Sequence, residues 1–174
     1  KGKGTNAMAI ETAGRLGTAT SVDALIAALS TDYKAEATAA LLAFNGNINE
    51  RVTTALKTAT GDLQLALLDI ANTRRIKSAS PQVFELINSS DATVAAAALK
   101  ALPGVVTKDN ATQLAGMMDK ASGEKAAIYQ QAFTASIKGM NAEELISRLE
   151  GTQCRGGTSC PDQLAKAVKE ALAK

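Results

Sequence analysis

The chain has 174 residues, enough for one ordinary domain and too few for two comfortable ones. About one residue in five is Ala and only 3% are aromatic, which favours helices and excludes an all-β sandwich. The absence of His removes the usual general base and the commonest metal ligand, and a net charge of +2 gives no nucleic-acid footprint. We therefore expect an all-α protein that is not an enzyme, with no cofactor, no metal and no nucleic-acid partner.

From the amino-terminal residues we expect the chain to be processed or excised from a larger protein. They read Lys1-Gly2-Lys3-Gly4, with neither Met nor the basic, apolar and small-residue succession of a signal peptide. No apolar run approaches the roughly 18 residues that span a bilayer, because even the run of residues 94–99 stops at Lys100. We expect no membrane insertion.

Pairs of large apolar residues at positions i and i+4 recur along the chain. Their first members are 27, 31, 31 and 31 residues apart. A fixed step of this size is typical of stacked helical repeats, in which one unit is too small to bury its apolar face alone. We expect all ten side chains to be buried. They are Leu25/Leu29, Val52/Leu56, Val83/Ile87, Leu114/Met118 and Leu145/Leu149.

Turn and capping signals divide each unit into two helices. Pro81 suits a first helical position, and Asn47 and Asn141 precede Glu50 and Glu144 in capping-box spacing. First helices are expected near residues 5–16, 32–44, 62–73, 91–102 and 124–138, and second helices near 21–29, 48–58, 80–89, 109–120 and 141–150. The units then cover about residues 5–29, 30–58, 60–89, 90–120 and 122–150.

The segment from Ala13 to Leu29 carries a family resemblance. It reads as an Ala-rich helix end, a Leu-Gly pair, a short turn and then Val-x-x-Leu-Ile-x-x-Leu. This pattern resembles the HEAT family of helical repeats, in its short units of about 30 residues. The resemblance covers residues 5–150 as five units and implies an interaction scaffold. From the fixed step and the capping signals we expect residues 1–150 to form one array, a right-handed α-solenoid of about five antiparallel helix pairs. A non-repetitive helical bundle is the alternative fold.

Residues 151–174 depart from the repeat. Cys154 and Cys160 lie in one short Gly-containing loop, and we expect a disulfide between them, which implies an extracytoplasmic location, periplasmic or secreted. The alternatives are two reduced thiols in a cytoplasmic protein or a metal site completed by carboxylates. After the loop, Leu164, Val168 and Leu172 form an apolar stripe that predicts a C-terminal capping helix, or the first helix of a sixth unit. We expect this stripe to cover the end of the array and Asp162, Lys166, Lys169 and Glu170 to face water.

No nucleophile paired with a base, phosphate loop or metal cluster is apparent in the sequence, so we expect any site to be an interaction surface. The densest basic run could hold an acidic partner, although cations at a helix C-terminus also stabilise the helix dipole. The second helices should present polar residues opposite their apolar pairs. Together these patterns predict a surface of seven residues, Arg51, Arg74, Arg75, Lys77, Gln82, Gln113 and Glu144.

Two functions fit these observations. The first is a non-catalytic helical-repeat scaffold that mediates protein–protein or interdomain contacts within a larger extracytoplasmic bacterial protein. The alternative is an accessory domain of an enzyme, for example one acting on carbohydrate or of lyase type, whose active site lies elsewhere in the parent chain. The expected partner is a protein or a neighbouring domain, and a small-molecule ligand is not expected because aromatic side chains are scarce.

Overall fold

The protein is helical, as its composition predicts. The structure, a computed structural model, describes residues 3–153 and 159–173. About 78% of these residues are in helices and none is in a strand. No helix among them is long and apolar enough to cross a membrane. The all-α expectation is therefore confirmed for the described part of the chain.

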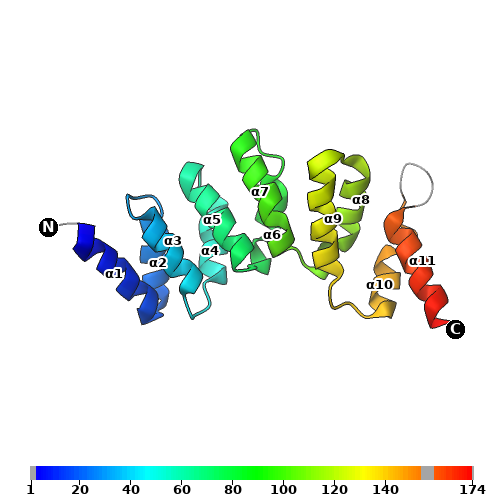
Figure 1. Ribbon diagram of the computed structural model, residues 1–174, viewed down its shortest axis with the longest axis horizontal. Helices are drawn as coiled ribbons and strands as arrows, with labels where there is room; N and C mark the ends of the chain where they lie inside the picture. Colours follow the sequence, from blue (N-terminus) through cyan, green and yellow to red (C-terminus); the bar gives the residue numbers. More distant parts are fainter. Residues whose placement is uncertain (1–2, 154–158, 174) are drawn as a thin grey trace. The chain divides into compact units, whose positions relative to one another are not determined.

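Each expected helix is present, with ends within a few residues of those predicted. The α-helices are α1 (Lys3–Leu16), α2 (Ala19–Ala28), α3 (Lys34–Ala43), α4 (Asn49–Thr58), α5 (Gly61–Thr73), α6 (Ser80–Leu86), α7 (Ala92–Val105), α8 (Ala111–Lys120), α9 (Gly123–Ile137), α10 (Ala142–Leu149) and α11 (Cys160–Leu172) (Figure 1). Two short 3-10 helices, η1 (Lys77–Ala79) and η2 (Lys108–Asn110), precede α6 and α8.

The capping signals were only partly correct. The side chain of Asn141 accepts a hydrogen bond from the Glu144 amide at 2.7 Å, and Pro81 lies in the first turn of α6. The Asn47 signal was wrong as a helix cap. Its side chain accepts the amide of Asn49 in a turn, while Ile48 precedes the helix without a side-chain cap. A short polar side chain that closes a local turn competes here with helix capping.

The helices form two compact units, residues 1–105 with α1–α7 and residues 106–174 with α8–α11. In the first unit α1 packs on α3, α3 on α5 and α5 on α7, which makes one row, while α2, α4 and α6 make a second row. Helices of the second row also contact the first-row helix that follows them in the chain. In the second unit α8 packs on α9 and α10, and α10 packs on α11.

The recurring apolar pairs supply part of the core. Eight of the ten side chains are buried, and Met118 and Leu145 are partly exposed. Further large side chains from α3, α5 and α7, among them Leu41, Leu67 and Leu102, are also buried. The i, i+4 pattern therefore identified the inward faces of the second-row helices, as the period of an α-helix requires.

The expected orientation of the last helix was wrong. Leu164 and Leu172 are 36% and 62% exposed, and Val168 is only partly buried. The buried residues of α11 are instead Pro161, Asp162 and Ala165, and α10 is the helix against which α11 packs. Hydrogen bonds at the start of α11, described below, turn the Asp162 face inward and leave the apolar stripe outside.

Candidate interaction surfaces

Most of the seven predicted surface residues make bonds inside the protein. Arg51 on α4 forms an ion pair with Asp23 on α2, which joins neighbouring helices of the second row. Gln82 on α6 has its carbonyl oxygen buried without a hydrogen-bond partner among the described residues, whereas Gln113 on α8 is exposed. Arg51 therefore contributes to packing, and Gln113 is available to solvent.

Arg74 holds the carboxyl end of another helix. Its guanidinium donates to the carbonyl oxygens of Leu42 at 3.0 Å, Phe44 at 2.7 Å and Gly46 at 3.2 Å. These oxygens lie at and beyond the end of α3, where backbone acceptors have no partner within the helix. Arg74 is therefore a structural cap between α5 and α3 and is not free to bind an acidic partner.

Arg75 lies at the end of α5 in a left-handed backbone conformation, with φ of 54°. Its amide donates to the Asn72 carbonyl, and the amide of Ile76 donates to the Ala71 carbonyl at 2.9 Å. This pair of bonds is the Schellman arrangement, in which glycine is the preferred residue at the left-handed position. Arg75 thus adopts a strained conformation to end the helix.

Lys77 binds backbone in the same region. Its ammonium donates to the Gly104 carbonyl near the end of α7 at 3.0 Å. Partial burial lowers its pKa, and the nearby charge of Arg75 lowers it further. The basic run therefore divides into two side chains that bind backbone carbonyls, Arg74 and Lys77, and one exposed side chain between them, Arg75.

Glu144 belongs to a network of charges in the second unit. Its carboxylate lies 2.8 Å from the Lys108 ammonium and 3.4 Å from the Arg148 guanidinium, which also pairs with Asp109 at 2.9 Å. The hydrogen bond from Lys108 lowers the pKa of Glu144 most. The network joins α10 to η2 and leaves little of Glu144 for an external partner.

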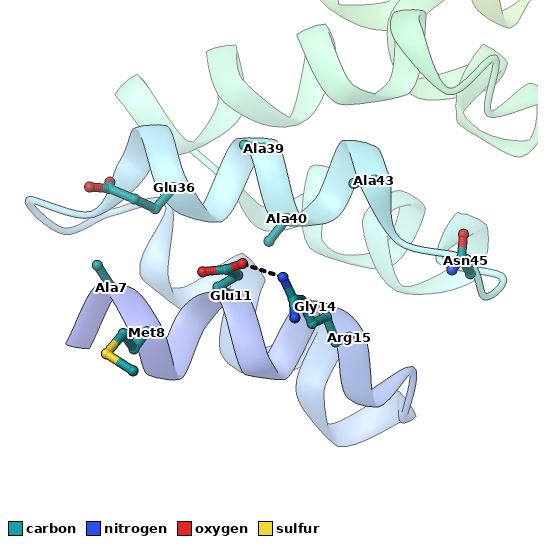
Figure 2. A pocket seen from close by; sticks show the side chains of 10 residues that line it. All are labelled: Ala7, Met8, Glu11, Gly14, Arg15, Glu36, Ala39, Ala40, Ala43 and Asn45. Atoms are coloured by element: carbon teal, nitrogen blue, oxygen red, sulfur yellow. Dashed lines mark hydrogen bonds and ion pairs between the residues drawn. The ribbon is translucent and has the colours of Figure 1, made fainter. Parts of the chain in front are cut away.

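An open hollow lies between α1 and α3 (Figure 2). It has a volume of about 530 Å³, and its walls carry the small residues Ala7, Gly14, Ala39, Ala40 and Ala43. We call it the α1–α3 groove. The two helices approach closely at Gly14. A Cβ added there would lie only 3.0 Å from the Cβ of Ala40, so a larger residue would not fit without a shift. Small side chains therefore shape both the helix contact and the groove above it.

The rim of the α1–α3 groove is polar and carries one long apolar side chain. Glu11 and Arg15 form an ion pair of 2.6 Å along α1, and Glu36 on α3 has no ion-pair partner among the described residues (Figure 2). Met8 is 68% exposed. An apolar floor with charges at the edges suits the apolar face of a helix better than a compact polar ligand.

A second set of interactions joins α11 to the end of α10. The carboxylate of Asp162, only 4% exposed, accepts the Gly151 amide at 2.8 Å and pairs with Lys166 at 2.6 Å. Ser159 accepts the amide of Asp162 at 3.1 Å and donates to the Thr152 carbonyl at 2.5 Å. We call these bonds the α10–α11 clasp. Its side chains fix both ends of the intervening loop.

The hydrogen bond from Lys166 lowers the pKa of Asp162 most, followed by the bond from the Gly151 amide. Both partners favour the ionised carboxylate, which also complements the positive end of the α11 dipole. Outside the clasp, Lys169 and Glu150 form a 2.7 Å ion pair between the same helices. The start of α11 is therefore attached by polar bonds rather than by its apolar stripe.

Cys160 is the first residue of α11, is exposed and has no disulfide partner among the described residues. Cys154, its expected disulfide partner, lies outside the described residues. The structure shows no disulfide among the residues it describes, and the bond stays a prediction. Among residues 3–153 and 159–173, no group of three or more acidic or Cys side chains is arranged to hold a metal ion.

Comparison with known proteins gives one match. The TSCPD domain family matches residues 110–172. No curated protein and no solved structure matches the chain. The matched segment covers most of the second unit, which begins at Val106. The chain is thus similar to TSCPD domains only over its C-terminal unit.

The similarity to TSCPD domains includes the clasp. Residues 158–162 read Thr-Ser-Cys-Pro-Asp, whose one-letter codes are those in the family name. Of the four that the structure describes, Ser159 caps α11, Pro161 lies in its first turn and Asp162 holds the Gly151 amide. Cys160 points to solvent. This part of the motif therefore combines three structural residues with one exposed thiol.

Sequence reasoning missed both the α1–α3 groove and the clasp. The Ala-rich sequence of α3 was visible, but only the helix contacts show which small residues line a groove. Asp162 was placed toward water because acidic residues are rarely buried unless they are paired. The Ser-x-x-Asp spacing from Ser159 was the signal that could have identified it as part of a cap.

The two adjacent arginines should respond oppositely to substitution. Arg74→Ala removes three charged hydrogen bonds to carbonyl oxygens and should lower the free energy of unfolding by about 2 kcal/mol. Arg75→Gly relieves the left-handed conformation and should raise it by up to about 1 kcal/mol. Urea denaturation monitored by circular dichroism measures both. Equal losses in the two variants would contradict these assignments.

The α10–α11 clasp should weaken in acid. The pKa of Asp162 is below its usual value, so its contribution to stability is present above about pH 4 and is lost as the pH falls through that lower value. Asp162→Asn should remove this dependence and speed amide exchange in α11, after correction for intrinsic exchange rates. Glu143→Gln, at an exposed carboxylate of α10, is the control and should behave as the wild type. Unchanged α11 exchange in Asp162→Asn would refute the clasp.

Proposed function

We propose that this protein is a non-catalytic helical-repeat scaffold that binds other polypeptides. The α1–α3 groove is the observation that supports a binding role, since it is an open apolar hollow of about 530 Å³ between two helices. Grooves of this kind accept the apolar face of a helix. The partner is accordingly a protein or a neighbouring domain with an exposed amphipathic helix.

The proposed fold of the scaffold is a HEAT-like right-handed α-solenoid of antiparallel helix pairs. Two rows of successive helices in the first unit support this proposal, because stacked pairs bury their apolar faces against the next pair. The recurring 31-residue step agrees with it. The TSCPD-like second unit continues the helical pattern with its own polar clasp.

The scaffold proposal has a direct test in cells. A photo-crosslinking amino acid in place of Ala43, an exposed residue of the groove, should give covalent adducts with polypeptides after irradiation. The same amino acid in place of Lys57, an exposed residue of α4 outside the groove, is the matched control. Adducts at position 43 but not at 57 support a docking groove. Absence of adducts at both positions, or equal adducts at both, would contradict it.

The proposed location is extracytoplasmic, and it depends on the two cysteines. A bond between Cys154 and Cys160 would require an oxidising compartment. Thiol titration of the unreduced, denatured protein should find no free thiol. Two thiols per chain would contradict the bond and remove this basis for an extracytoplasmic location.

A further inference from the structure

A small hollow lies between α8 and α9 in the second unit. It has a volume of about 160 Å³, and its walls are Met117, Lys120 and Ala121 at the end of α8 and Lys125 and Tyr129 on α9. Within each group the residues are three or four positions apart, so they share one face of their helix. We call this space the α8–α9 hollow.

Tyr129 is a buried polar side chain that lines the hollow. It is only 4% exposed, and its hydroxyl has no hydrogen-bond partner in the part of the chain that the structure describes. Polar groups of buried side chains are normally hydrogen-bonded, because leaving them without a partner costs free energy. The hydroxyl of Tyr129 is therefore available to an oxygen atom of a ligand in the hollow.

Two ammonium groups border the same space. Lys120 and Lys125 are exposed, and neither forms an ion pair with a residue that the structure describes. The Lys125 ammonium lies 5.8 Å from the centroid of the Tyr129 ring, within the range of cation–π attraction. Asp119 and Glu124 adjoin the two lysines in sequence and do not line the hollow. The charged side chains that line the hollow are thus both positive.

These groups suit an anion with several acceptor oxygens. Two ammonium groups and one hydroxyl can donate from different sides of the hollow, and lysine is a common ligand of phosphate. A carboxylate has two oxygens in one plane, whereas a phosphate group presents oxygens in several directions. Met117 and Ala121 complete the wall, and their apolar atoms exclude water, which strengthens the attraction between opposite charges.

We infer that the α8–α9 hollow binds a phosphate group, held by Lys120, Lys125 and the hydroxyl of Tyr129. The hollow belongs to the second unit and the α1–α3 groove to the first, so this inference does not rest on the proposed function. A phosphate group needs no stacking partner, so the scarcity of aromatic residues does not count against it. Free phosphate and a phosphate monoester present the same oxygens to the hollow.

Titration of the whole, isotope-labelled chain with inorganic phosphate, followed by the NMR shifts of its amides, tests the inference. Sodium chloride holds the ionic strength constant, because salt screens exposed charges. The shifts should saturate and centre on residues 117–129. Methyl phosphate should compete for the same site, and acetate should bind at least fivefold more weakly. Whichever of the two phosphates binds more tightly identifies the source as the free anion or a monoester.

Three variants assign the binding groups. Tyr129→Phe keeps the ring, removes only the hydroxyl and should weaken phosphate binding at least threefold. Lys125→Gln removes one lining charge at an exposed position and should weaken it at least fivefold. Lys138→Gln removes the same charge from an exposed lysine at the other end of α9, outside the hollow, and should bind as the wild type does.

Circular dichroism checks that each variant is folded, and Lys125→Gln keeps the test valid if Tyr129→Phe is not. Shifts that do not saturate would overturn the inference, as would acetate binding as tight as that of phosphate. Equal weakening by Lys125→Gln and Lys138→Gln would reduce the effect to net charge and would overturn it too. So would phosphate binding that a folded Tyr129→Phe variant leaves unchanged.

Discussion

Close approach between alternate helices is the constraint on which the first unit depends. At Gly14 a single added carbon would press on Ala40, and at Gly104 it would overlap the backbone and side chain of Asn72. Small residues at these contacts let α1 reach α3 and α7 reach α5. The large side chains of the other helix faces then meet inside, where apolar burial stabilises the unit. The abundance of Ala is therefore a packing requirement as well as a helix preference.

The same use of small residues creates the groove. Where Ala and Gly residues face solvent between two helices, few side-chain atoms fill the space above the helix contact. A chain built for close helix approach thus exposes hollows that a larger side chain can enter. The close helix contact and the groove have a common physical origin in this part of the molecule.

Three charged residues secure the ends of helices. Arg74 and Lys77 donate hydrogen bonds to the backbone carbonyls of Phe44 and Gly104, at the ends of α3 and α7. The carboxylate of Asp162 accepts the backbone amide of Gly151, just after α10. Helix ends leave backbone groups without partners, and a charged side chain satisfies them strongly. Arg74 and Lys77 were candidates for partner binding, and their internal bonds direct attention to the apolar surfaces instead.

The sequence by itself determined the all-α class, the positions of the helices and eight of the buried apolar side chains, because the helical period and capping residues are local properties. The apolar pair Leu114/Met118, one buried and one partly exposed, shows the limit of that reasoning. Only the tertiary structure decided which face of α11 is buried, because that depends on bonds from Asp162 and Ser159 to residues eleven and seven positions away. It also decided that Arg74 caps a helix 30 residues earlier in the chain, since a sequence pattern does not carry the distance between helix ends.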